Sequence, residues 1–150
     1  PICFLMAMQT VEWDRSALLA PMIGGAKYIL EKSADYAGKR EQFGKTIGEF
    51  QATKHKLANI RIFYEAAKLL VYRIAWYKSQ GRPLNHLAAA VAKLFVGDWS
   101  LGPFNDAILI HGGYGYCHEY IMEGAFRDNR LAPLGGGTSD IQKMIISRMM

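Results

Sequence analysis

Apolar residues recur every three or four positions along most of this chain, which is the spacing of one helical face and not the alternation of a strand. The first expected helix starts near Val11 and ends before Gly38. Its apolar face consists of Leu19, Ile23, Ala26 and Leu30. A helix of this length needs other helices to cover that face, because burial of the apolar side supplies most of its stability.

A second helix is expected from just after Gly48 to about Gln80, where the sequence Gly81-Arg82-Pro83 stops it. Basic residues occupy other positions than its apolar stripe, as in an amphipathic helix. The stripe consists of Leu57, Ile60, Tyr64, Ala67, Val71 and Ile74.

The third expected helix begins after Asn85, a residue type that caps helix N-termini well, and runs to His111. Gly102-Pro103 should kink or break it, because proline has no amide hydrogen and its ring clashes with the preceding turn. Gly112-Gly113 ends this helix, and a loop with one short helical turn is expected from there to about Arg130.

A last helix is expected from Thr138 onward, with Ser139 and Gln142 in the S-x-x-Q spacing of a capping box. No strand pair is predicted beyond the first few residues. The pattern therefore predicts an all-α fold, an up-down four-helix bundle with short connections, over residues 11–150. Residues 1–10 are apolar but short and lack a basic leading region, so we expect the tail of a missing preceding β-domain, or a linker, and no signal peptide.

Composition adds few constraints. The net charge of +5 is scattered along the expected helices, which disfavours a nucleic-acid surface and is compatible with a phosphate-bearing ligand. No apolar run approaches the roughly 20 residues that span a bilayer. Cys3 and Cys117 form no C-x-x-C pair, which indicates free thiols in a reducing compartment, the cytoplasm or the mitochondrial matrix. The four histidines show no metal-ligand spacing: His55, His86, His111 and His118.

Three segments carry chemistry: Y-A-G-K-R-E-Q-F-G-K-T-I-G-E-F-Q at 36–51, H-G-G-Y-G-Y-C-H-E-Y-I-M-E-G-A-F-R-D-N-R at 111–130, and G-G-G-T-S-D-I-Q at 135–142. A glycine triplet before a helix exposes backbone N-H groups at a positive dipole end, although it is also a common turn. Together and in this order, the segments resemble the C-terminal helical domain of the acyl-CoA dehydrogenases, from about Val11 to Met150.

The resemblance implies FAD as cofactor and an acyl thioester as substrate. It places Thr138, Ser139 and Asp140 against the flavin and Gly137 against the thioester, beside Gly136. It implies that Arg40 contacts the FAD pyrophosphate of a neighbouring subunit, in a homotetramer built as a dimer of dimers. The residues near that pyrophosphate would be Gln42, Phe43, Phe50 and Gln51, and Leu109, Gly112 and Gly113 would supply the adenine side. Without the resemblance, a solvated arginine beside Lys39 is the preferred interpretation of Arg40.

Two positions depart from the family pattern. The usual glutamine of the Q-x-x-G-G segment is Leu109, which loses an amide donor and acceptor. The glutamate that often precedes the G-T pair is Gly136, which cannot remove a proton. A branch of the family carries its base on the first helix before an arginine, and the family spacing from Arg40 leads to Asp14, next to Arg15.

Asp14 is therefore the candidate catalytic base, with Glu12 as a second choice and Arg15 orienting the substrate. Aspartate is shorter than glutamate by about 1.5 Å, and misplacement of that order can lower a rate by roughly a hundredfold. The alternative role for Asp14 is an N-terminal acid that stabilises the helix dipole by roughly 0.3–1 kcal/mol.

The expected reaction is α,β-dehydrogenation of an acyl-CoA, with electrons passing to an electron-transfer flavoprotein or another acceptor. The 150-residue chain alone should be inactive, because the domains that hold the flavin ring are missing. Two alternatives stay open: a dehydrogenase of carrier-protein-bound acyl groups, and a helical assembly module without chemistry.

Overall fold

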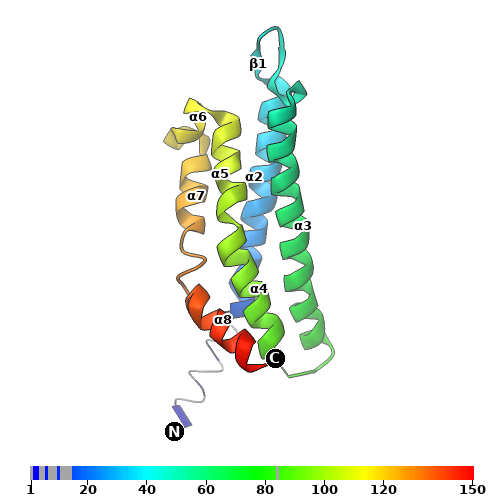
Figure 1. Ribbon diagram of the computed structural model, residues 1–150, viewed down its shortest axis with the longest axis vertical. Helices are drawn as coiled ribbons and strands as arrows, with labels where there is room; N and C mark the ends of the chain where they lie inside the picture. Colours follow the sequence, from blue (N-terminus) through cyan, green and yellow to red (C-terminus); the bar gives the residue numbers. More distant parts are fainter. Residues whose placement is uncertain (1, 4–5, 7–9, 11–14, 84) are drawn as a thin grey trace.

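The computed structural model describes residues 2–3, 6, 10, 15–83 and 85–150 of the chain. Long helices run up and down the same axis in an elongated bundle (Figure 1). The elements, in chain order, are α2 (Leu19–Lys39), β1 (Glu41–Gln42), β2 (Lys45–Thr46), η1 (Ile47–Glu49), α3 (Gln51–Ser79), α4 (His86–Trp99), α5 (Leu101–His111), α6 (Gly113–Tyr116), η2 (His118–Tyr120), α7 (Met122–Asn129) and α8 (Ser139–Arg148).

The predicted all-α, up-down four-helix bundle is confirmed. Its four arms are α2, α3, the consecutive pair α4 and α5, and the pair α7 and α8 (Figure 1). Helix α3 packs against α2, α4 and α5, while α5 packs against α7 and α4 against α8. Connections between arms are short, as expected of antiparallel neighbours.

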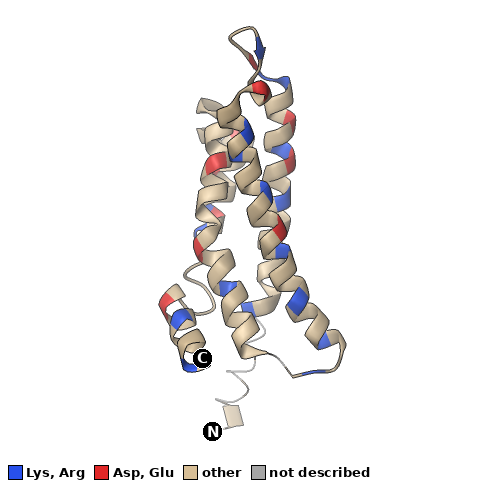
Figure 2. Ribbon diagram, turned by 45° about the vertical axis from the view of Figure 1, so that its right-hand side comes forward, with Lys and Arg blue, Asp and Glu red and all other residues tan. Residues whose placement is uncertain are grey.

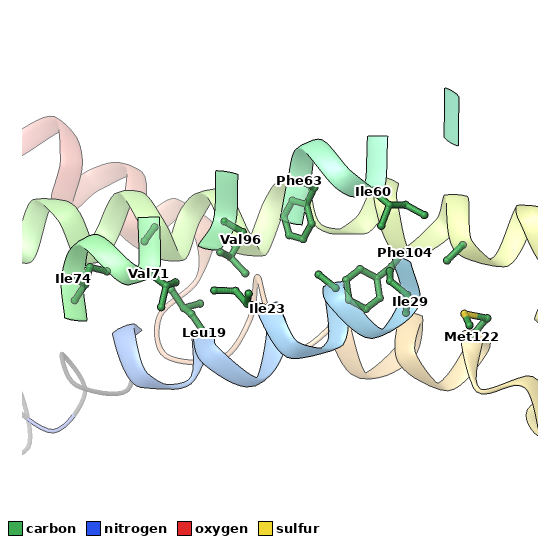
Figure 3. Packing of buried hydrophobic residues seen from close by; sticks show 14 of the residues in the cluster. Leu19, Ile23, Ile29, Ile60, Phe63, Val71, Ile74, Val96, Phe104 and Met122 are labelled. Carbon is green, nitrogen blue, oxygen red and sulfur yellow. The ribbon is translucent and has the colours of Figure 1, made fainter. Parts of the chain in front are cut away.

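The core lies between α2, α3 and the α4–α5 arm (Figure 3). Ile29 and Ile60 are almost completely buried and face each other's helices, and Phe104 of α5 fills the space beside them. Burying one such side chain contributes about 1.5–3 kcal/mol. The stripe predicted on the second helix is only partly buried, because Leu57 and Tyr64 lie at the edge of the core.

The first helix does not end before Gly38 but continues through it to Lys39. Gly38 keeps helical backbone geometry in that last turn, because one glycine costs a helix only about 1 kcal/mol relative to alanine, which tertiary packing overrides. The start expected near Val11 lies outside the described residues, although the chain is already helical at Arg15. Of the first ten residues, the structure describes Ile2, Cys3, Met6 and Thr10, and each of them is helical.

Asn85 is confirmed as the N-cap of the third helix, since its side-chain oxygen accepts a hydrogen bond of 2.9 Å from the amide of Ala88. The expected break at Gly102-Pro103 is placed too late, because α4 ends at Trp99 and α5 begins at Leu101. Pro103 then falls in the first turn of α5, where a proline costs no intrahelical hydrogen bond.

Ser139 and Gln142 do not form the predicted capping box. Thr138 is the N-cap of α8, and no side chain caps it. The hydroxyl of Ser139 donates instead to Asp98 of α4, and the amide of Gln142 turns back to the glycine segment. A capping box does occur at Thr46 and Glu49, where the sequence analysis predicted none.

Two connections are more regular than expected. Strands β1 and β2 form a two-residue antiparallel hairpin after α2, with Phe43 and Gly44 at its tip in the positive-φ region. Residues 113–129, predicted as a loop with one helical turn, form α6, η2 and α7. Ile121 allows the change of direction before α7 by adopting φ 65°.

Charged residues are spread along the bundle without a single-sign face in the view of Figure 2. Within the described residues, no helix is long and apolar enough to cross a membrane.

Candidate functional site

The candidate base, Asp14, lies outside the described residues, as do Glu12 and Trp13. Its neighbour Arg15 is described, and its Nε donates a 3.0 Å hydrogen bond to the carbonyl oxygen of Gly136. The chain that follows Asp14 therefore passes directly beside the glycine segment. The structure thus brings together Arg15 and Gly136, two positions predicted to bind substrate.

The glycine segment is a tight turn in front of α8. Gly136 has φ 66° and Gly137 has φ 99°, a region that residues with a Cβ rarely adopt. A Cβ on Gly137 would also lie 2.8 Å from Nε2 of Gln142 and 3.5 Å from Nη2 of Arg15. Glycine is needed at 137 for both conformation and space.

Buried polar side chains from two helices hold this turn. Gln142 of α8 is completely buried, and its Nε2 donates to the carbonyl oxygen of Gly137 at 3.1 Å. Lys93 of α4 is 3% exposed, and its Nζ donates to the carbonyl oxygen of Ala132 at 2.7 Å. The sequence analysis missed Lys93 because an alanine-rich helix gives no sign that one lysine points inward.

Burial lowers the pKa of Lys93, because an ammonium group loses hydration in the protein interior. The carboxylate of Asp98 acts in the opposite direction, and the guanidinium of Arg15 lowers this pKa further. Lys93 and Arg15 are therefore close enough to influence each other, although they come from different helices.

A cavity of about 690 Å³ opens beside the turn. It lies between the N-terminal half of α2, α7 and the segment before the turn, and its wall is largely apolar. Lining residues include Arg15, Met22, Tyr28, Lys93, Phe104 and Gly136. The combination of a largely apolar cavity and a few polar groups is typical of a small-molecule site.

A second group of predicted residues lies at the opposite end of α2. Arg40 follows that helix, and its guanidinium lies 5.8 Å from the ring centre of Tyr114 in α6. Among the described residues, no ion pair involves Arg40. Phe43 is 92% exposed at the hairpin tip and lies edge-on to Phe50 at 6.2 Å.

The turn predicted at Gly112 and Gly113 is present beside Arg40. Gly112 has φ 60° and separates α5 from α6. Leu109, in the last turn of α5, is 53% exposed, so its apolar side chain faces outward where the family has a glutamine. Gln42 lies in β1 and is exposed, and Gln51 begins α3 beside the same hairpin.

Under this turn lies a cluster of stacked rings that the sequence analysis did not predict. His111 is buried, stacks on Tyr36 at 4.3 Å and lies 2.8 Å through Nδ1 from the carbonyl oxygen of Ala107. Tyr120 completes the cluster against Tyr114 at 4.9 Å. Burial raises the pKa of Tyr36, and the cation of Arg40 opposes that shift.

The two groups are not brought together within one chain. Helix α2 has 21 residues and is therefore about 30 Å long at 1.5 Å per residue, and it lies between Arg15 and Arg40. The residues expected to touch the flavin, Thr138, Ser139 and Asp140, start α8 on the Arg15 side. No side chain spans that distance.

The histidines show no metal site. His118 is exposed and lies 2.7 Å through Nδ1 from the carboxylate of Glu123, and this hydrogen bond lowers the pKa of Glu123. Within the part of the chain that the structure describes, no three His, Cys, Asp or Glu side chains are placed to hold a metal ion.

Comparison with known proteins gives the following relatives. The chain is 39% identical over 147 residues to the probable acyl-CoA dehydrogenase YngJ of Bacillus subtilis, covering 98% of the chain and 38% of that protein. It is 37% identical to an L-prolyl-[peptidyl-carrier protein] dehydrogenase of Pseudomonas fluorescens, covering 91% of this chain and 36% of that protein. It is also 37% identical to the caffeyl-CoA reductase-Etf complex subunit CarC of Acetobacterium woodii, covering 98% and 38%.

Solved structures of similar proteins have the same helical fold. The butyryl-CoA dehydrogenase of Megasphaera elsdenii matches with a TM-score of 0.91 and 34% identity over 97% of this chain and 38% of that one. The FAD complex of PigA matches with a TM-score of 0.88 and 30% identity, over 95% of this chain and 37% of that one. The chain thus spans less than two fifths of the length of these relatives.

The family model for the acyl-CoA dehydrogenase C-terminal domain matches residues 4–150, nearly the whole chain. Family model, curated relatives and solved structures therefore agree on the family, and the solved structures agree with the helical arrangement described above. The chain belongs to the acyl-CoA dehydrogenase family and has the fold of that family's C-terminal helical domain.

Proposed function

We propose that this chain is the C-terminal domain of an FAD-dependent dehydrogenase that converts an acyl-CoA thioester to its α,β-unsaturated product. One observation carries the proposal: the arginine that follows Asp14 is hydrogen-bonded to the glycine turn at the mouth of an apolar cavity. A base, a turn with available amides and room for an acyl chain are what α-proton removal requires.

Asp14 removes the α-proton in this proposal. The bond between Arg15 and Gly136 fixes the neighbouring backbone beside the turn. Gly136 has no side chain, so a carboxylate approaching from the start of the first helix meets no competing group there. Bound FAD would accept the hydride that leaves the β-carbon, and reduced flavin would pass electrons to an acceptor such as an electron-transfer flavoprotein.

The residues present suit FAD. Arg40 is exposed, has no described ion-pair partner and presents a planar fork of donors, which matches a pyrophosphate. Its ring contact with Tyr114 holds it next to the Gly112 turn. At the other end, Thr138 and Ser139 begin α8, where the helix dipole favours electron-rich groups.

The separation of the two groups by the length of α2, about 30 Å, supports a site shared by two copies. In this proposal, the Thr138 side of one copy holds the flavin, while Arg40 of another copy holds the pyrophosphate. Assembly and cofactor binding would then depend on each other, in a homotetramer arranged as a dimer of dimers.

We further propose that residues 1–10 connect this domain to preceding domains that complete the flavin site. A chain that spans less than two fifths of its relatives provides one wall of such a site. This 150-residue chain alone should therefore be inactive.

A substrate carried on a protein is the second candidate. It is favoured by the identity of 37% to a dehydrogenase of prolyl groups on a peptidyl-carrier protein. Loss of chemistry, with the bundle kept as an assembly module, is the third, and Gly136 and Leu109 favour it.

The test uses the complete protein that contains this chain, as wild type and as Asp14→Ala. Flavin absorbance is followed without oxygen while a panel of acyl-CoAs is added. Bleaching by the wild type and its loss in a flavin-replete Asp14→Ala variant would support the proposal. Bleaching that survives the substitution would remove Asp14 from the mechanism, and a flavin-loaded wild type that bleaches only with carrier-bound acyl groups would favour the second candidate.

A further inference from the structure

We propose that Gln142 is a positioning residue, which together with Arg15 fixes the direction in which the glycine turn presents its backbone amides. This inference rests on the proposed function for its catalytic consequence. Its structural part does not depend on which substrate the protein takes.

Two peptide units of the turn have their carbonyl groups hydrogen-bonded to side chains. The carbonyl oxygen of Gly136 accepts from Nε of Arg15 at 3.0 Å, and that of Gly137 accepts from Nε2 of Gln142 at 3.1 Å. Gln142 also approaches the oxygen of Gly136 at 3.5 Å. Both carbonyl groups are thus held toward the protein side of the turn.

The amide groups of these units then point the other way. In a trans peptide the N-H of one residue is antiparallel to the carbonyl of the residue before it, and the described residues contain no cis peptide bond. The N-H groups of Gly137 and Thr138 therefore face away from Arg15 and Gln142. Among the described residues, neither amide donates to another backbone group.

Gln142 is well suited to hold this arrangement. Its side chain is completely buried, and its Oε1 has no described hydrogen-bond partner. The hydrogen bonds that Nε2 donates to the turn therefore compensate for burying this amide. A Cβ on Gly137 would lie 2.8 Å from Nε2, which shows how closely the amide fits the turn. With both carbonyls fixed, the N-H groups of Gly137 and Thr138 are left as donors on the outer side of the turn, where an electron-rich oxygen of a bound molecule would be recognised.

The sequence also offers a matched control. Gln80, which follows α3, is exposed, and its amide bonds only weakly to Ser79 at 3.5 Å. Gln142→Met removes the donor and keeps the length of the side chain, and Gln80→Met makes the same chemical change on the surface.

The experiment uses the complete flavin-loaded protein. Hydrogen exchange of the peptide covering 131–141 is measured by mass spectrometry for wild type, Gln142→Met and Gln80→Met. We expect exchange in this segment to be faster than in the wild type for Gln142→Met and unchanged for Gln80→Met. Exchange in α2 and α3 should be unchanged in both variants. Equal exchange in all three proteins would overturn the inference, whatever the reaction.

The effect of Gln142 on catalysis is measured as the rate of anaerobic flavin bleaching. Gln142→Met should slow bleaching by about 10- to 100-fold, while the acyl-CoA concentration for half-maximal rate changes less. A loosened turn that bleaches at the wild-type rate would reduce Gln142 to a structural role and overturn the positioning role. If the wild type itself never bleaches, the dehydrogenase function fails, and the exchange data still decide whether Gln142 holds the turn.

Gln142→Glu provides a second signature. An ionised carboxylate is repelled by two carbonyl oxygens, whereas a protonated carboxyl can donate to them as the amide does. Bleaching by this variant, relative to Gln80→Glu, should therefore recover as the pH falls. The nearby cation Arg15 opposes protonation of the carboxyl introduced at position 142, whereas burial favours protonation of that carboxyl. A constant ratio across pH would contradict a donor role for residue 142.

Discussion

Arg15 and Gly136 lie 121 positions apart in the chain, and Nε of the first donates to the carbonyl oxygen of the second at 3.0 Å. This bond joins the start of the first helix to the turn before the last. It brings together Arg15, the residue after the candidate base, and the turn that contains Gly136 and Gly137.

Replacing Arg15 by lysine should weaken that junction, because a lysine ammonium cannot reproduce the planar fork of donors. A hydrogen bond from a charged group contributes about 1.5–3 kcal/mol. The solvent that reaches this partly buried pair reduces the loss, so we expect about 1 kcal/mol of destabilisation. Urea unfolding of the complete protein measures it, with the exposed Arg148→Lys as control. Equal midpoints for both variants would show that the bond contributes nothing.

Gly137→Ala should destabilise the protein by about 1–3 kcal/mol, because alanine meets both strain at φ 99° and the amide of Gln142. Gly24→Ala is the matched change: this glycine lies inside α2 and nothing approaches its added Cβ within 4 Å. There we expect a gain of about 0.4–1 kcal/mol. Thermal unfolding of both variants provides the comparison, and a neutral Gly137→Ala would refute the reading of the turn.

A base can be moved to the position that many family members use. In the Asp14→Ala background, Gly136→Glu should restore part of the lost flavin bleaching, since residue 136 lines the cavity. Restoration should be incomplete, because glutamate at φ 66° is strained by about 1–2 kcal/mol. A flavin-replete double variant with no recovery would indicate that the two positions do not reach the same carbon.

Two inactive variants should complement each other if the site is shared between copies. Coexpressed Asp14→Ala and Arg40→Ala chains place an intact Asp14 opposite an intact Arg40 in about one site in four, since half of random pairs are mixed and each mixed pair has one intact site. Flavin content and bleaching of the mixture, compared with each variant alone, measure this. Activity no higher than that of the separate variants would argue against a shared site.

Glu123 predicts an acid dependence of stability. Its hydrogen bond with His118 lowers its pKa, so the folded state releases the proton more readily than the unfolded state. The resulting stabilisation is fully present above the usual carboxyl value of 4.5 and is lost as the pH falls through the lowered value. Unfolding midpoints of wild type and Glu123→Gln should therefore converge in acid. Glu119→Gln, an exposed neighbour, should show no such convergence.

The sequence alone determined the bundle, because helical periodicity is a local property that each segment carries by itself. Leu19 and Ile23 of α2, and Ile60, Val71 and Ile74 of α3, were predicted on apolar faces and are buried. The cap at Asn85 and the turns at Gly112 and Gly136 were predicted for the same reason, since they depend on the chemistry of one residue and its neighbours.

Only the tertiary structure decided which polar groups meet. Gln142 has the spacing of a capping box, but a buried amide needs partners, and its Nε2 donates to the carbonyl oxygen of Gly137. Lys93 points inward because a carbonyl from a segment 39 residues later is available to it. The separation of Arg15 from Arg40 likewise follows from the length of α2, which continues through Gly38 to Lys39 although an earlier end was predicted.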